Sequence, residues 1–99
     1  MIVVTGLIEI SELDRDRAIL LATELAQETR KETGCLSCGF YEDIGHPCRI
    51  RVYEEWESDE VLARHFTMPH MVRFAEGMGD MEIVAMDIQK FEAGPRSPI

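Results

Sequence analysis

The sequence predicts a small α+β domain in which helices cover one face of an antiparallel sheet. Four segments of the 99-residue chain are rich in β-branched and apolar residues or alternate as strands do. Helical spacing of apolar residues appears after the first and after the third of these segments. The resulting order, strand–helix–strand–strand–helix–strand, is that of the ferredoxin-like arrangement.

The first strand and helix occupy the first third of the chain. Ile2 to Ile10 is β-branched and mostly apolar, which indicates a strand buried on both faces or nearly so. Ser11 and Asp14 form a pattern like a capping box, so we expect the helix to begin there. We expect it to end at Gly34, a plausible C′ residue. The inward stripe of this helix is Ala18, Leu21, Ala22, Leu25 and Ala26.

A hairpin is expected next. Leu36, Cys38 and Phe40 alternate with smaller or polar residues, as in a strand. The segment Asp43 to Pro47 is the predicted turn, and Arg49 to Trp56 is the predicted partner strand.

The second helical region is expected in two pieces. Ser58 or Asp59 can cap its start, and Pro69 prevents continuation of the first piece. Gly77 and Gly79 are expected to end the second piece.

The last strand is predicted from Ile83 to Phe91. We therefore expect one domain over residues 1–91 and a C-terminal tail over residues 92–99.

Composition and charge exclude some functions. A net charge of −9 argues against binding to nucleic acid, whose phosphates favour basic surfaces. No apolar run approaches the roughly 20 residues that cross a membrane. The first residues do not resemble a secretory signal, so we expect a cytoplasmic protein.

Apolar side chains fall on both faces of the two outer strands of the pattern. Helices of this chain can cover only one face, which predicts a homodimer formed through the open sheet face. In the first strand Val3 and Leu7 point opposite to Ile2, Val4 and Ile8. In the last strand Ile83 and Ala85 point opposite to Val84, Met86 and Ile88.

The cysteines allow more than one interpretation. Cys35 and Cys38, with His46 and Cys48, are four soft donors that could bind zinc. Their spacing is not that of a common zinc finger, and a regular strand would place Cys35 and Cys38 on opposite faces. A disulfide between Cys38 and Cys48 is conceivable, but a reducing compartment disfavours it. We expect free buried thiols and no metal.

Four residues of chemical interest converge where the third strand meets the following helix. Trp56 and Glu54 share one side of the strand, and His65 shares the inward side of the helix. His70 follows just after Pro69. Such a cluster is either a set of satisfied buried groups or a catalytic site with shifted pKa values. His65, His70 and Glu54 are therefore the candidate catalytic residues.

This region resembles the antibiotic biosynthesis monooxygenase family, and most closely its quinol monooxygenase branch. The resemblance rests on Tyr53-Glu54-Glu55-Trp56-Glu57-Ser58, followed by Leu62, His65 and Thr67-Met68-Pro69-His70-Met71. Glu32-Thr33-Gly34-Cys35-Leu36 is similar to the Glu-x-Gly-Cys segment of the family.

The resemblance implies a ferredoxin-like domain that dimerises into an α+β barrel. It also implies oxidation of a quinol or polycyclic phenol with dioxygen, without metal or flavin. In that reaction His65 would remove the phenolic proton, with Glu54 or His70 orienting it. An apolar pocket would hold the ring, lined by Trp56, Phe66, Met71, Phe74, Leu62 and Val52.

Departures from the family keep alternatives open. Val52 and Leu62 stand where a polyketide-tailoring branch carries asparagine and tyrosine, and haem-degrading relatives carry tryptophan in place of His65. A branch that isomerises or cleaves a phosphorylated autoinducer sugar shares the two histidines. A non-catalytic ligand-binding module or a structural partner remains a further alternative.

Overall fold

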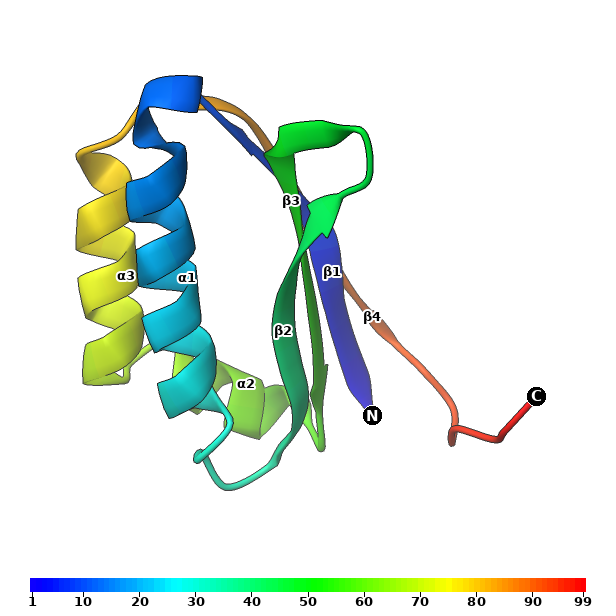
Figure 1. Ribbon diagram of the computed structural model, residues 1–99. Helices are drawn as coiled ribbons and strands as arrows, with labels where there is room; N and C mark the ends of the chain where they lie inside the picture. The colour runs from blue at the N-terminus through cyan, green and yellow to red at the C-terminus, as the bar shows by residue number, and fades with distance from the viewer.

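The computed structural model describes residues 1–99 and shows a four-stranded antiparallel sheet with all helices on one face (Figure 1). The strand order is β2-β3-β1-β4, which confirms the predicted ferredoxin-like α+β fold. In chain order the elements are β1 (Ile2–Ile10), a 3-10 turn η1 (Glu12–Asp14), α1 (Arg15–Thr29), β2 (Cys35–Asp43), β3 (His46–Trp56), α2 (Asp59–His65), α3 (Pro69–Gly79) and β4 (Ile83–Glu92).

The start of α1 differs from the expected capping box. Ser11 makes no side-chain cap and instead donates from its hydroxyl to the Asp14 carboxylate at 3.1 Å. The same carboxylate accepts from the backbone N–H of Glu82 at 3.0 Å, so it ties this turn to the start of β4.

Two predicted boundaries were wrong. The helix ends at Thr29 rather than at Gly34, because the chain leaves it through successive tight turns. The hairpin turn is only Ile44–Gly45, since backbone pairing extends β2 and β3 into the predicted loop. Gly45 has a φ of +84°, which suits a tight turn.

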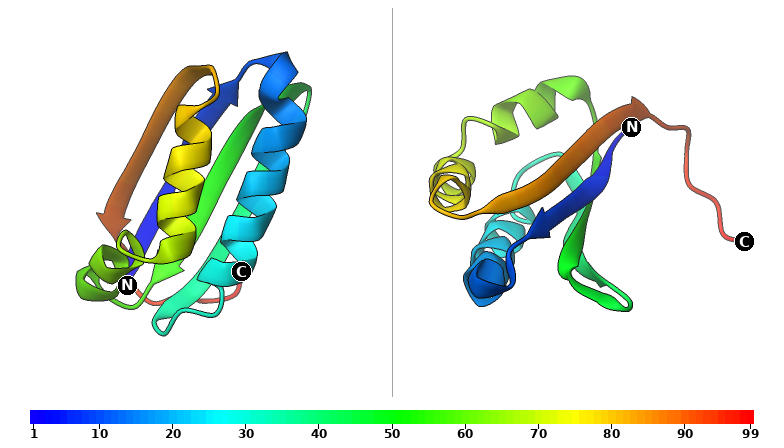
Figure 2. Two further views of the ribbon diagram at one scale, coloured as in Figure 1. Left: turned by 90° about the vertical axis from the view of Figure 1, so that its left-hand side faces the viewer. Right: turned by 90° about the horizontal axis from the view of Figure 1, so that it is seen from above.

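The interface between helices and sheet contains two clusters. The Ile10 cluster is entirely apolar and comprises Ile8, Ile10, Ala18, Ile50 and Met81. The Trp56 cluster comprises Ile2, Val4, Trp56 and Leu62. Helices α1 and α3 lie side by side across the sheet, and α2 closes the end where β3 finishes (Figure 2).

The helices cover one face of the sheet, as predicted, but they leave part of the edge strand β4 exposed. On the helix side, Met86 and Ile88 of the edge strand β4 remain 63% and 41% exposed. On the open side, Val3 is buried within the protomer, and Glu55 beside it accepts from Tyr53 and Arg96. No helix of the protein combines the length and the apolar character that a membrane crossing requires.

Candidate active site

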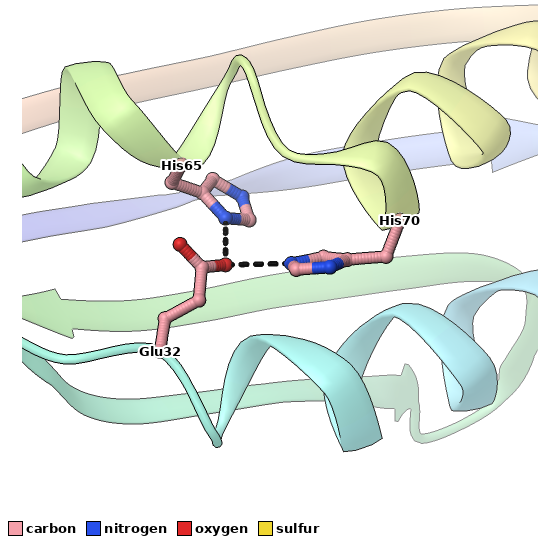
Figure 3. A group of neighbouring side chains, drawn as sticks. All are labelled: Glu32, His65 and His70. Atoms are coloured by element: carbon pink, nitrogen blue, oxygen red, sulfur yellow. Dashed lines mark hydrogen bonds and ion pairs between the residues drawn. The ribbon is translucent and has the colours of Figure 1, made fainter.

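Two histidines bind one buried carboxylate oxygen (Figure 3). Nδ1 of His65 lies 2.6 Å from Oε2 of Glu32, and Nε2 of His70 lies 2.7 Å from the same atom. The side chains of His65, Glu32 and His70 are 2%, 6% and 13% exposed. With an ionised carboxylate as the acceptor, hydrogen has to be on these two nitrogens. In a neutral imidazole the lone pair is then on the other nitrogen, Nε2 of His65 or Nδ1 of His70.

The interruption between α2 and α3 brings the two imidazoles together. His65 is the last residue of α2, and Pro69 is the first residue of α3. The backbone N–H of Met68 bonds the carbonyl of His65 at 3.1 Å, so the link is a tight turn. The chain therefore changes direction between the two histidines, and their ring centroids come within 6.0 Å of each other.

The loop between α1 and β2 positions Glu32. Its N–H bonds the carbonyl of Thr29, and its own carbonyl accepts from Cys35. Gly34 has a φ of +92°, and a Cβ atom there would lie 2.8 Å from the Val61 side chain. Only glycine combines this conformation with such close packing of the loop on α2. The fit of Gly34 therefore helps to hold Glu32 against α2.

A second buried carboxylate lies in the same region. Glu54 accepts a hydrogen bond from Nε1 of Trp56 at 2.9 Å, and the indole of Trp56 packs on His65 at 4.7 Å between centroids. Burial raises the pKa of Glu54 above its ordinary value, although the Trp56 hydrogen bond and the charge of His65 act in the opposite direction. Glu32, not Glu54, is therefore the carboxylate that orients His65.

The cysteines are free, and the strand places them differently from the expectation. Leu36 is the extra residue of a bulge between Cys35 and Ser37, which turns both Cys35 and Cys38 toward the helices. Burial raises the pKa of Cys35, and burial with the charge of Glu54 raises the pKa of Cys38 to about 12.

The residues predicted to line one pocket lie in different parts of the structure. Leu62 and Val52 are packed in the core, and Trp56 is fully buried. Phe66 lies 5.6 Å from His65 by ring centroids but is half exposed. Met71 is half-buried on α3, and Phe74 stacks on Phe40 at 5.9 Å.

A separate cavity of about 350 Å³ lies between α1 and the β2–β3 hairpin. Its apolar lining includes Ala22, Ala26, Phe40 and Ile50, and Arg30 is one of its charged residues. Neither histidine of the cluster lines it.

Sequence reasoning did not include Glu32 among the site residues. The three donor atoms of Glu32, His65 and His70 lie within 4.8 Å of one another, a set that suits a divalent metal as well as proton sharing. The only signal for Glu32 in the sequence was the Glu-x-Gly-Cys segment, because a loop residue has no periodicity to place it.

Comparison with known proteins agrees with this architecture. A crystal structure of a candidate antibiotic biosynthesis monooxygenase from Deinococcus radiodurans has a TM-score of 0.92 and 24% identity, covering 100% of this chain and 98% of that chain. A Bacteroides thetaiotaomicron protein of unknown function, described as a possible oxidoreductase, has a TM-score of 0.85 and 27% identity, covering 93% of this chain and 96% of that chain.

Sequence comparison identifies the family. The uncharacterized protein sll1783 of Synechocystis sp. is 31% identical over 80 residues, which are 81% of this chain and 54% of that protein. The chain thus spans about half the length of this relative. The model of the family described as antibiotic biosynthesis monooxygenase matches residues 1–77. The chain therefore belongs to the antibiotic biosynthesis monooxygenase family.

Proposed function

We propose that the protein is a monooxygenase that oxidises a quinol or polycyclic phenol with dioxygen and needs no bound cofactor. Family membership supports a monooxygenase-type activity. The observation that carries the chemical part is the pair of imidazoles held on one buried oxygen of Glu32. This resembles the general arrangement in which a carboxylate fixes the tautomer of a catalytic histidine.

The proposed reaction begins with proton removal. A phenol has a pKa of about 10, and its anion gives up an electron to dioxygen more readily than the neutral form does. The free lone pair of His65 or His70 would take the proton, while Glu32 holds the hydrogen on the opposite ring nitrogen. One oxygen atom then enters the ring as a carbonyl, the other leaves as water, and the substrate itself supplies the electrons.

Oxygen uptake with a panel of naphthalene and anthracene hydroquinones tests this function. Glu32→Gln keeps the size of the side chain but removes its charge, and we expect the rate to fall about 10²-fold or more. The matched control is Glu28→Gln, on the exposed end of α1. His65→Asn and His70→Asn then show which imidazole is the base. No uptake above spontaneous oxidation with any quinol would reject the proposal.

The cavity beside α1 supports a second candidate, an isomerase or lyase of a small phosphorylated sugar. Arg15 and Arg30 line that cavity, and guanidinium groups bind phosphate well. Binding of a sugar phosphate that Arg30→Gln abolishes, without oxygen uptake on quinols, would favour this alternative. Binding without turnover of either substrate class would favour a non-catalytic module.

We also propose a homodimer, formed through the open sheet face. Phe91 is 52% exposed on that face, while Met86 is 63% exposed on the helix side of the same strand. Phe91→Lys should therefore give a monomer in sedimentation, while Met86→Lys and Ser97→Lys should leave a dimer. The reverse result would move the interface to the helix side of β4.

A further inference from the structure

The Glu32–His65–His70 cluster has the donors of a metal site. It presents one carboxylate oxygen and two imidazole nitrogens, the ligand set of many three-residue zinc sites. A sequence pattern of two histidines separated by Pro69 offers no third ligand. The fold supplies that ligand from the loop before β2, 33 residues before His65 in the chain.

The charge around the cluster favours a cation. The side chain of Glu32 is 6% exposed and Glu54 is also 6% exposed, so two carboxylates lie near each other away from solvent. No lysine or arginine forms an ion pair with either of them. Buried carboxylates need a compensating positive charge, which an ion bound by three side chains supplies.

The spacing requires only a small adjustment. The nitrogens lie 2.6 and 2.7 Å from Oε2 because hydrogen atoms join them. Around a tetrahedral ion with bonds of about 2.0–2.1 Å, the same atoms would be about 3.3 Å apart. Each donor atom has to move by less than about 1 Å, and the partly exposed imidazole of His70 is the side chain with the most freedom.

We propose that Glu32, His65 and His70 form a binding site for a divalent transition-metal ion, with water in the fourth position. Zn²⁺ is the appropriate probe because it accepts nitrogen and oxygen ligands and has no redox chemistry. Its effect on turnover rests on the proposed monooxygenase function. The bound ion would fix both imidazoles and Glu32 in a new arrangement, and we expect it to inhibit quinol oxidation.

The test measures binding separately from activity. Protein treated with a chelator and then freed of it is titrated with Zn²⁺ by calorimetry, and the visible spectrum of bound Co²⁺ reports the coordination geometry. We expect one ion per chain and an increase in melting temperature. Glu32→Gln and His70→Asn should each weaken binding about 100-fold or more. Circular dichroism checks that both variants are folded, and His70→Asn alters the more exposed side chain.

Controls distinguish this site from the other donors of the chain. Cys48→Ser and His46→Asn alter the alternative zinc set, and Glu28→Gln alters an exposed carboxylate, so none of them should change the affinity. Absence of one-to-one binding at micromolar Zn²⁺, or binding that Cys48→Ser removes and Glu32→Gln retains, would overturn the proposal. Because these readouts need no substrate, they decide the metal site even if no quinol is oxidised.

Discussion

The two ends of the interface between helices and sheet use the same backbone architecture for different purposes. The Ile10 cluster contains only apolar side chains. At the other end, the Trp56 cluster adjoins two carboxylates and two imidazoles. Burial of apolar surface stabilises the first end directly. Burial of polar groups at the second end costs free energy unless each group has a partner.

The comparison shows that the buried polar groups beside the Trp56 cluster lower the stability of the fold relative to an apolar core. The Trp56 indole, the Glu54 carboxylate and both imidazoles each have a hydrogen-bond partner there. Hydrogen bonding reduces the cost of burying these groups but does not make such an arrangement more stable than an apolar core of the same shape. We therefore expect substitutions to act in opposite directions at the two ends.

The largest effect is expected at the apolar end. Ile10 is 2% exposed, and Ile10→Ala should lower the free energy of unfolding by about 2–5 kcal/mol through lost burial and a cavity. Urea unfolding measures this loss. Ile44→Ala, in the fully exposed hairpin turn, is the control and should be neutral. A loss below about 1 kcal/mol for Ile10→Ala would show that this end does not dominate stability.

At the polar end, Glu54→Gln should increase stability near pH 7 by about 1 kcal/mol, because it removes a buried charge and keeps an acceptor for Trp56. Burial raises the pKa of Glu54 in the folded state, so the folded protein binds this proton more tightly than the unfolded chain does. In the wild type, the contribution of Glu54 to the free energy of unfolding is therefore present at low pH, where the carboxyl is protonated. It is lost as the pH rises through the raised pKa.

The advantage of Glu54→Gln should accordingly shrink as the pH is lowered toward 4.5. Unfolding curves between pH 4.5 and 7.5 test the sign. A variant that is less stable than wild type at pH 7 would mean that an ionised Glu54 is held by a cationic His65.

A gain of similar size is expected at Thr29, which is fully buried and whose hydroxyl has no hydrogen-bond partner. Thr29→Val has the same shape and should raise the free energy of unfolding by about 1 kcal/mol. Thermal unfolding measures the change, and Thr23→Val on the exposed face of α1 is the control. A loss of stability at Thr29 would reveal a partner for the hydroxyl in solution.

The smallest effect is expected at Cys38, whose thiol should hardly react with an alkylating reagent. Because burial raises its pKa to about 12, only about one thiol in 10,000 is ionised at pH 8. Iodoacetamide should modify the half-buried Cys48 first and leave Cys38 intact, as judged by mass spectrometry of peptides. Equal labelling of both at pH 8 would show that this end of the core opens readily.

Periodicity predicted much of this arrangement from sequence. The alternation of β3 placed Glu54 beside Trp56, and helical spacing placed His65 inward, as the structure confirms. It could not reveal Glu32, which lies in a loop and reaches His65 only through tertiary packing. Periodicity could not reveal the bulge at Leu36 either. One extra residue in a strand moves every earlier side chain to the opposite face, so strict alternation placed Cys35 on the wrong face.

The turn between His65 and His70 has a consequence for how this chain can change in length. Hydrogen bonds from Thr67 to the carbonyl of Arg64 and from Met68 to the carbonyl of His65 close this turn, and the closed turn sets the direction in which α3 leaves it. An insertion between Phe66 and Met68 would therefore alter the orientation of α3 and separate His70 from Glu32. The two-residue turn at Ile44–Gly45 is exposed, and a Cβ atom added at Gly45 would meet no other atom within 4 Å. Loop grafts and inserted peptides belong at that hairpin, whereas the link between the helices acts as a spacer of fixed length.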